Sequence, residues 1–352
     1  MQCKRCILDD RYPAIKFNED GICSECLNFD RTWGKHAKDP DFLKQATNKL
    51  ESILYAAKEA GGEYDCTVNT CGGIDSLYVL YLIKTRYKMN PLVITVDNGF
   101  INPRAKENLK KVVGRLGVKH VYYNAGDLKP LYRQFLMTTG IFCHLCFYLI
   151  AFHSVRIALE NGTPLLVTGM SKRFDVFLPY GIEPFRLMHV MNAGKDTFSE
   201  YPWLKKRALI SLFKYLLKSR VVYLPDYVSW DKRGNESFLE KEFDITLGGE
   251  HYDCYMHDFA AYLSRKKYGF SGDTLNCCQM IRNGELDREE AVKLAAIEES
   301  KTPENMEQIL DYFKLGEREI DDCIERSRIL DSRLTPRAGQ FLRKIYFRSQ
   351  LF

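Results

Sequence analysis

Apolar residues change their spacing along this chain, and the change predicts both strands and helices. Short apolar runs, typical of buried strands, occupy residues 66–70, 92–97, 120–123 and 165–169. Apolar residues at helical spacing predict helices at 39–60, 76–86, 103–116 and 146–160. Strands that alternate with helices in this way favour an α/β fold with a doubly wound parallel sheet, covered by helices on both faces.

Residues that suit a nucleotide follow the predicted strands. Ligands of doubly wound folds bind beyond the carboxyl ends of the strands. Asp97 ends the second strand and is placed to meet a ribose or an adenine. Gly169 ends the fourth strand and permits close approach of a nucleotide, while Lys172 and Arg173 just after it are suited to hold phosphates. Each residue alone is common in turns or on surfaces, so the prediction rests on their joint position.

A glycine-rich turn follows the first strand. Gly72 and Gly73 allow backbone dihedrals that a Cβ forbids, so that successive N–H groups can point at one anion. The helix that follows Asp75 and Ser76 adds its positive N-terminal end. The turn lacks both the Gly-Lys-Ser/Thr ending of a P-loop and the third glycine of a dinucleotide fold. We therefore expect a phosphate-binding loop, the alternative being an ordinary turn capped by Asp75 or Ser76.

The first thirty residues carry two Cys-x-x-Cys pairs with the spacing of a zinc ribbon. The pairs are Cys3 with Cys6 and Cys23 with Cys26. Such a short segment builds no core of its own, so bound Zn²⁺ would fold it. Four thiolates close the site, which predicts a structural and not a catalytic metal. Four unrelated reduced cysteines are the alternative.

Composition narrows the class of protein. The chain has 352 residues, 45% of them hydrophobic, which is enough for a large core. A net charge of +5 excludes a strongly basic nucleic-acid scaffold. The chain opens on charged residues, and its 12 cysteines fit a reducing compartment, so we expect a cytoplasmic protein. Charged and polar residues interrupt the apolar stretch 142–159, which predicts a buried helix and no membrane span.

These features divide the chain into three regions. Residues 1–35 form a zinc-ribbon-like module, and residues 36–180 form the nucleotide-binding core. Residues 181–352 form a mainly helical region for substrate binding or oligomerisation. Assembly into a homo-oligomer stays open. His251 and His257, at helical spacing, are expected to be structural.

The loop from Cys71 to Ser76 resembles Ser-Gly-Gly-x-Asp-Ser, the pyrophosphate loop of the N-type ATP pyrophosphatases, or PP-loop enzymes. Cys71 stands at the position of their first serine, and a thiol is the weaker hydrogen-bond donor. A working natural variant, an engineered substitution and a pseudo-enzyme all fit that difference, and the first is favoured. Most of the chain is similar to the N-acetyl sugar amidotransferases of this class, on motifs at 3–6, 17–26, 64–76, 96–99, 267–270 and 284–290.

The resemblance implies a reaction and its cofactors. ATP would adenylate the acetamido oxygen of an N-acetylated sugar or nucleotide-sugar, and nitrogen from ammonia would replace that oxygen. Cys71, Gly72, Gly73 and Ser76 would bind the nucleotide, and Asp75 would help to hold Mg²⁺. The chain shows no glutaminase features, so a separate glutaminase subunit would supply the ammonia.

The rival is insertion of sulfur. Cys143 and Cys146 stand ahead of a predicted helix, at a position that resembles the central Cys-x-x-Cys of PP-loop tRNA thiolases. There, three cysteines hold a [4Fe–4S] cluster, and Cys254 is our candidate for the third, with Cys277 and Cys278 as alternatives. Nucleic acid is a partner only in this case. Two buried packing cysteines, or a non-catalytic nucleotide-binding zinc-ribbon protein, are the remaining alternatives.

Overall fold

The computed structural model describes residues 1–12, 15–34, 36, 39–141, 143–163, 165–171, 197, 199–201, 220–248 and 252–333, with the side chains of 328–333 left out. Three residues named above, Lys172, Arg173 and His251, lie outside the described residues. The sheet and the helices below belong to these described residues.

Five parallel strands form the sheet. They are β1 (Cys66–Asn69), β2 (Pro91–Asp97), β3 (Lys119–Asn124), β4 (Leu165–Thr168) and β5 (Arg220–Tyr223). Their order is β3-β2-β1-β4-β5, and each neighbouring pair is parallel. The chain therefore runs outward from β1 to β3, then restarts at β4 on the other side of β1. This confirms the doubly wound sheet and places its switch point between β1 and β4.

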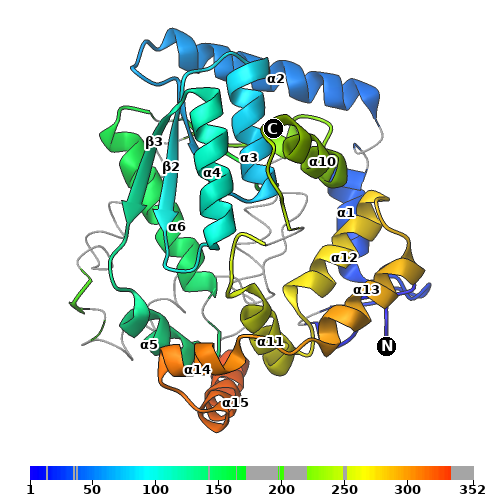
Figure 1. Cartoon of the computed structure of the whole chain (residues 1–352). Helices are drawn as coiled ribbons and strands as arrows, with labels where there is room; N and C mark the ends of the chain where they lie inside the picture. Colours follow the sequence, from blue (N-terminus) through cyan, green and yellow to red (C-terminus); the bar gives the residue numbers. More distant parts are fainter. Residues whose placement is uncertain are drawn as a thin grey trace.

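Two hydrophobic cores lie on the two faces of the sheet, because side chains alternate along each strand. In β2, Leu92, Ile94 and Val96 pack into one core together with α6 (Cys143–Glu160). Val93 points the other way, into a second core. Four helices build that second core, α2 (Pro40–Glu59), α3 (Ile74–Tyr81), α4 (Pro103–Leu116) and α10 (Lys232–Phe243). Figure 1 shows α4 and α6 on opposite sides of the strands.

Helix ends follow local capping signals. Asp39 accepts the N–H groups of Asp41 and Phe42 at 3.0 and 3.3 Å, and Pro40 begins α2. Asn102 caps α4 in the same way. The expectation that a helix begins at Cys146 is wrong, since α6 begins at Cys143. Both cysteines thus lie on its first turn and, three residues apart, on one face.

The most apolar helix, α6, is part of the core. By length and composition it is the one helix among the described residues that is long enough and apolar enough to cross a membrane. It packs against β1, β2 and β4, and half of it is buried inside the protein. The buried residues include His144 and His153. This packing agrees with the core helix that the interrupted apolar run predicts.

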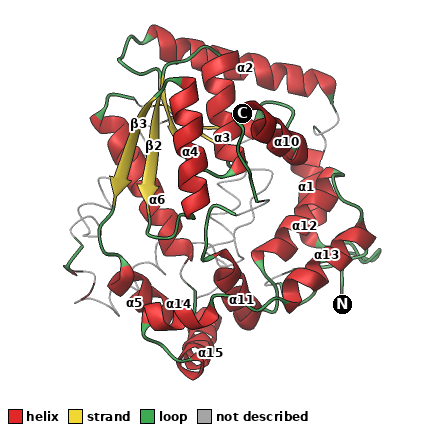
Figure 2. Ribbon diagram, in the orientation of Figure 1, coloured by secondary structure: helices red, strands yellow, loops and turns green. Residues whose placement is uncertain are grey.

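Helices also make up the C-terminal region. They are α11 (His257–Tyr268), α12 (Gly272–Asn283), α13 (Arg288–Ser300), α14 (Met306–Phe313) and α15 (Glu317–Arg333). The last two pack against α5 (Lys129–Thr139), a helix that the apolar pattern missed. Figure 2 shows how far helices outweigh strands in this part of the molecule. The described residues also form short helical turns: α1 (Ser24–Phe29), Asp30–Gly34, Leu82–Arg86 and Leu224–Asp226.

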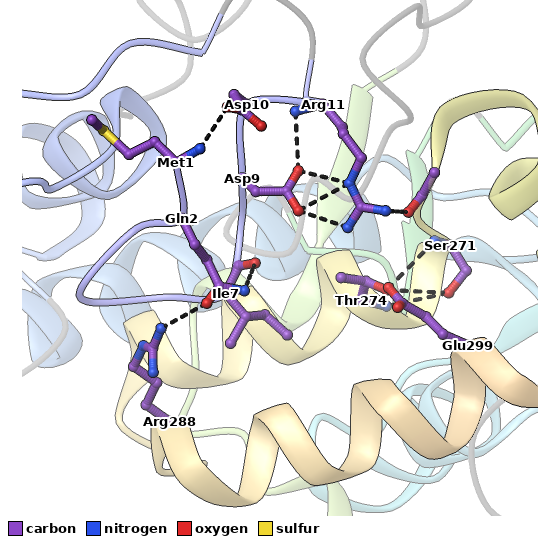
Figure 3. A network of polar contacts seen from close by, with 11 residues as sticks. Met1, Gln2, Ile7, Asp9, Asp10, Arg11, Ser271, Thr274, Arg288 and Glu299 are labelled. Carbon is purple, nitrogen blue, oxygen red and sulfur yellow. Dashed lines mark hydrogen bonds and ion pairs between the residues drawn. The ribbon is translucent and has the colours of Figure 1, made fainter.

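The N-terminal segment docks onto these C-terminal helices. Arg288 of α13 donates a hydrogen bond to the side chain of Gln2 at 3.0 Å (Figure 3). It also donates to the carbonyl of Cys6 at 3.2 Å. From the other side, Arg11 donates to the carbonyl of Gly269 at 2.5 Å. The four N-terminal cysteines share one hydrophobic core with residues of α11 to α15. The two ends of the described chain therefore form one packing unit.

A pH-dependent contact joins α11 and α12. Nε2 of His257 lies 3.3 Å from a carboxylate oxygen of Asp273. Burial alone would lower the pKa of His257, but the hydrogen bond and charge of Asp273, aided by Asp258 and Asp253, raise it. The contact therefore stabilises the fold fully below the histidine's ordinary pKa and loses this effect as pH rises through the folded value.

Replacing His257 with glutamine should lower the free energy of unfolding by up to about 1 kcal/mol at acidic pH and by much less in alkaline solution. Urea unfolding of the wild type and the variant at both pH values measures the difference. An equal loss at both would show that protonation of His257 does not contribute.

Candidate functional site

The turn between β1 and α3 is built for close backbone contact. Gly72 has φ of +95°, and a Cβ there would lie 2.5 Å from the backbone oxygen of Ala105 in α4. Thr70 accepts the N–H of Gly72 at 3.1 Å, and its hydroxyl lies 2.7 Å from that of Ser76. Ser76 in turn donates to the carbonyl of Gly73 at 2.9 Å. The loop is therefore held rigid before any ligand binds.

The amino end of α3 is left open to a ligand. Gly73 is its N-cap residue, and among the described residues no side chain caps the helix. Asp75 and Ser76 therefore do not cap the helix as the alternative expected, and phosphate binding by the loop stays a prediction. Uncapped N–H groups and the helix dipole together favour an anion such as a phosphate.

The loops after β1 and β4 meet at the switch point. A Cβ on Gly169 would lie 2.8 Å from the backbone carbon of Asp75, so glycine is required for this contact. One carboxylate oxygen of Asp75 accepts the indole N–H of Trp230 at 2.9 Å. The structure thus brings together three predicted residues, Asp75, Gly169 and the loop glycine Gly73, and leaves the role of Asp75 toward Mg²⁺ a prediction.

Asp97, at the end of β2, is engaged by its neighbours. It accepts hydrogen bonds from Lys106 and from the N–H of Gly99, both at 2.9 Å, and from the hydroxyl of Tyr122. Partial burial opposes its ionisation, but these donors outweigh burial and lower the pKa of Asp97. If Asp97 contacts the nucleoside as predicted, it does so while paired with Lys106.

A segment that the sequence did not single out completes the loop. Tyr252 donates its hydroxyl hydrogen to the carbonyl of Gly72 at 2.5 Å, and the thiol of Cys71 donates to Oδ2 of Asp253 at 2.7 Å. Tyr252 lies 180 residues after Gly72 in the sequence, and no motif marks residues 252–254. Of these three residues, the sequence indicates only Cys254, as a candidate third cluster ligand.

The three cysteines of the sulfur alternative lie near one another. Burial first, and then the negative charge of Cys146, raises the pKa of Cys254 to about 12. Burial of its sulfur is the main cause that raises the pKa of Cys143, and the charges of Cys254 and Cys146 add to it. The residue as a whole is nevertheless exposed. Cys278, by contrast, lies beside the N-terminal Cys6, which favours Cys254 as the third thiol of the group.

Cys146 has donors of its own. The side-chain amide of Asn98, next to Asp97, donates to its sulfur at 2.8 Å. Burial raises the pKa of Cys146, and hydrogen bonding from Asn98 and Tyr132 acts to lower it. The end of β2 therefore contributes Asp97 to the predicted nucleoside site. Through Asn98 it also contacts the cysteine group formed by Cys143, Cys146 and Cys254.

The four N-terminal sulfurs form a closed cluster. The Sγ atoms of Cys3, Cys6, Cys23 and Cys26 all lie within 4.8 Å of one another, and all four residues are buried. Those of Cys6 and Cys23 are 3.7 Å apart. A tetrahedral zinc site with its usual Zn–S bonds requires about 3.8 Å.

Backbone groups support the same cluster. The sulfur of Cys3 accepts the N–H groups of Arg5, Cys6 and Cys23 at 3.3 to 3.5 Å. Such donors stabilise thiolates, and Arg282 brings a cation to within 3.9 Å of the sulfur of Cys6. The four-cysteine cluster is confirmed as a candidate metal site, and its donor set fits Zn²⁺.

Comparison with known proteins gives one family match and one long relative. Residues 248–333 match the C-terminal domain of the LPS biosynthesis protein WbpG-like family. An uncharacterized protein of Methanocaldococcus jannaschii is 27% identical over 308 residues, which is 87% of this chain and 96% of that protein.

Two solved structures are similar to this chain at low sequence identity. One is the U34-tRNA thiolase NcsA from Methanococcus maripaludis with its [4Fe–4S] cluster, with 17% identity, a TM-score of 0.39 and coverage of 87% of this chain and 90% of that one. The other is NMN synthetase from Francisella tularensis, with 12% identity, a TM-score of 0.26 and coverage of 59% and 88%.

The contact at Gly169 gives a direct test of the site. Replacing Gly169 with alanine should push the start of α3 away from β4 and weaken binding of an ATP analogue by roughly tenfold or more, since the new Cβ meets backbone. Gly114, in α4, has open space around it, so Gly114→Ala is the matched control and should leave binding unchanged. Calorimetric titration measures both, and equal affinities would contradict this placement of the nucleotide.

The two groups of cysteines should behave independently. Replacing Cys23 with serine should release Zn²⁺ and lower the melting temperature by several degrees, because the metal holds a segment without a core of its own. Replacing Cys143 with serine should leave the Zn²⁺ content unchanged. Metal analysis and thermal unfolding of the two variants check this, and zinc retained in Cys23→Ser would refute the site.

Proposed function

We propose that this protein is an ATP-dependent amidotransferase that acts on an N-acetylated sugar or nucleotide-sugar of surface-glycan synthesis. The observation that carries the proposal is that residues 252–254 of the C-terminal region contact the loop between β1 and α3. The uncapped end of α3 suits phosphates, and residues 252–254, which touch that loop, belong to the part that matches the WbpG-like family. A domain described for LPS biosynthesis at a nucleotide-type loop supports a glycan substrate.

The proposed reaction has two steps. The acetamido oxygen attacks the α-phosphorus of ATP, and pyrophosphate leaves. Ammonia then attacks the activated carbon and loses a proton, and AMP leaves with the former acetamido oxygen to give an acetamidino group. Bound Mg²⁺ would screen the phosphate charge.

This chain's own residues bind and orient the reactants. The backbone N–H groups of the glycine loop and of the amino end of α3 would hold the phosphates. The adenosine would lie between the strand ends at Asp97 and Gly169. Lys172 and Arg173 are proposed to neutralise phosphate charge. The hydrogen bonds among Thr70, Ser76 and Gly73 keep the loop rigid. Donors that are fixed in advance need no reorganisation during the reaction.

The proposal includes partners and a location. A glutaminase subunit would supply the ammonia, and the reaction would take place in the cytoplasm, where ATP is available. The N-terminal Zn²⁺ would be structural, holding its segment against α12 and α13.

Sulfur insertion is the second candidate, and one observation favours it. Cys143, Cys146 and Cys254 come from two distant segments but lie close enough for their charges to influence one another, and Asp253, next to Cys254, touches the phosphate loop. Thiolates in such a group are suited to bind iron. A [4Fe–4S] cluster held there would make the protein a sulfur transferase for tRNA or a small molecule.

One experiment separates the candidates. The protein is incubated with ATP, Mg²⁺, ammonia and a panel of nucleotide-activated acetamido sugars, and the products are analysed by mass. We expect a product in which NH replaces the acetamido oxygen, and measurable turnover by a variant with Cys143, Cys146 and Cys254 all changed to alanine. Joint loss of iron and of turnover in a folded variant would support sulfur insertion, and absence of ATP binding would support a non-catalytic protein.

A further inference from the structure

We propose that Asp253 is the carboxylate through which the C-terminal region holds the Mg²⁺ of the bound nucleotide, an inference that rests on the proposed ATP site. Asp253 belongs to the segment that contacts the phosphate loop. A Cβ on Gly73 would lie 3.2 Å from its carboxyl carbon and 3.3 Å from each of its two oxygens. The carboxylate is thus packed directly against the loop at the amino end of α3.

Electrostatics makes this position unfavourable for bare ATP. A carboxylate in contact with a phosphate loop would repel the phosphate charges at short range. A divalent cation between carboxylate and phosphates reverses the sign of the interaction, and Mg²⁺ is commonly bound by one or two carboxylates together with substrate phosphates. A cation of this class therefore gives the position of Asp253 a physical reason.

Other contacts hold the carboxylate in place without neutralising it. Cys71 donates its thiol hydrogen to Oδ2, and the N–H of Asn102 donates to the backbone carbonyl of Asp253 at 2.8 Å. The contact between Sγ of Cys71 and Oδ2 of Asp253, 2.7 Å long, leaves the second carboxylate oxygen to face the loop at Gly73. Cys71 is a positioning residue in this scheme.

The other two carboxylates of the site are already engaged. Asp75 accepts from Trp230, and Asp97 pairs with Lys106. Within the described residues, no lysine or arginine forms an ion pair with Asp253, and His257, which feels its charge, is paired with Asp273. Among the described residues Asp253 thus lacks the cation partner that Asp97 has, and it could share a Mg²⁺ with Asp75.

The test compares binding of α,β-methylene-ATP by the wild type and Asp253→Asn, each with Mg²⁺ and with EDTA, by calorimetric titration. With Mg²⁺ the variant should bind roughly tenfold more weakly, and with EDTA it should bind at least as tightly as the wild type, because a repelling charge is gone. Asp258→Asn, an exposed change five residues along, is the matched control and should behave as the wild type.

A second readout observes the cation itself. Electron paramagnetic resonance of Mn²⁺ in the complex with the analogue should show weaker Mn²⁺ binding in Asp253→Asn. The asparagine amide would present a donor to Cys71, so Asp253→Ser is a second neutral variant if the first fails to fold. Full Mg²⁺ dependence in a folded variant overturns the role of Asp253 alone, whereas a wild-type protein that binds no analogue overturns the ATP site as well.

Discussion

The close backbone approach at the switch point is the constraint on which the rest of the site depends. Gly72 touches the carbonyl of Ala105, and Gly169 touches the backbone of Asp75, at distances that admit no side chain. These contacts fix α3 against both α4 and β4. Because α3 cannot move, its open amino end, Asp75 and the loop hydroxyls stay in one geometry, which is what preorganised binding of an anion requires.

The C-terminal region acts on this rigid centre through three consecutive residues. Tyr252 contacts Gly72, Asp253 contacts Cys71, and Cys254 belongs to the cysteine group. An isolated bridge between Cys254 and Ile101 holds the segment beside the end of β2. The helices behind it share a core with the N-terminal cysteines. The metal segment is therefore linked to the loop through the packing of these helices.

Local pattern predicted most of the sheet and the loop but not the long-range contacts. The apolar runs placed four strands closely, because short runs rich in β-branched, aliphatic or aromatic residues leave a clear signal, even in β3, where no residue is fully buried. They missed β5, which is only four residues long. Periodicity also misplaced the start of α6, since Cys143 is as compatible with a helix as with a turn. Asp253 left no signal at all, because its importance comes from the fold bringing it to Cys71.

The cysteine group also limits which sulfur chemistry the fold permits. The pKa of Cys254 is about 12, and that of Cys143 is raised as well, so both free thiols would stay protonated near neutral pH. A protonated thiol is a poor nucleophile toward an adenylated carbon. A bound metal would favour the thiolates, because coordination requires deprotonated cysteines. Sulfur insertion would therefore be favoured by a cluster held at this group, whereas nitrogen insertion would place no such demand on its cysteines.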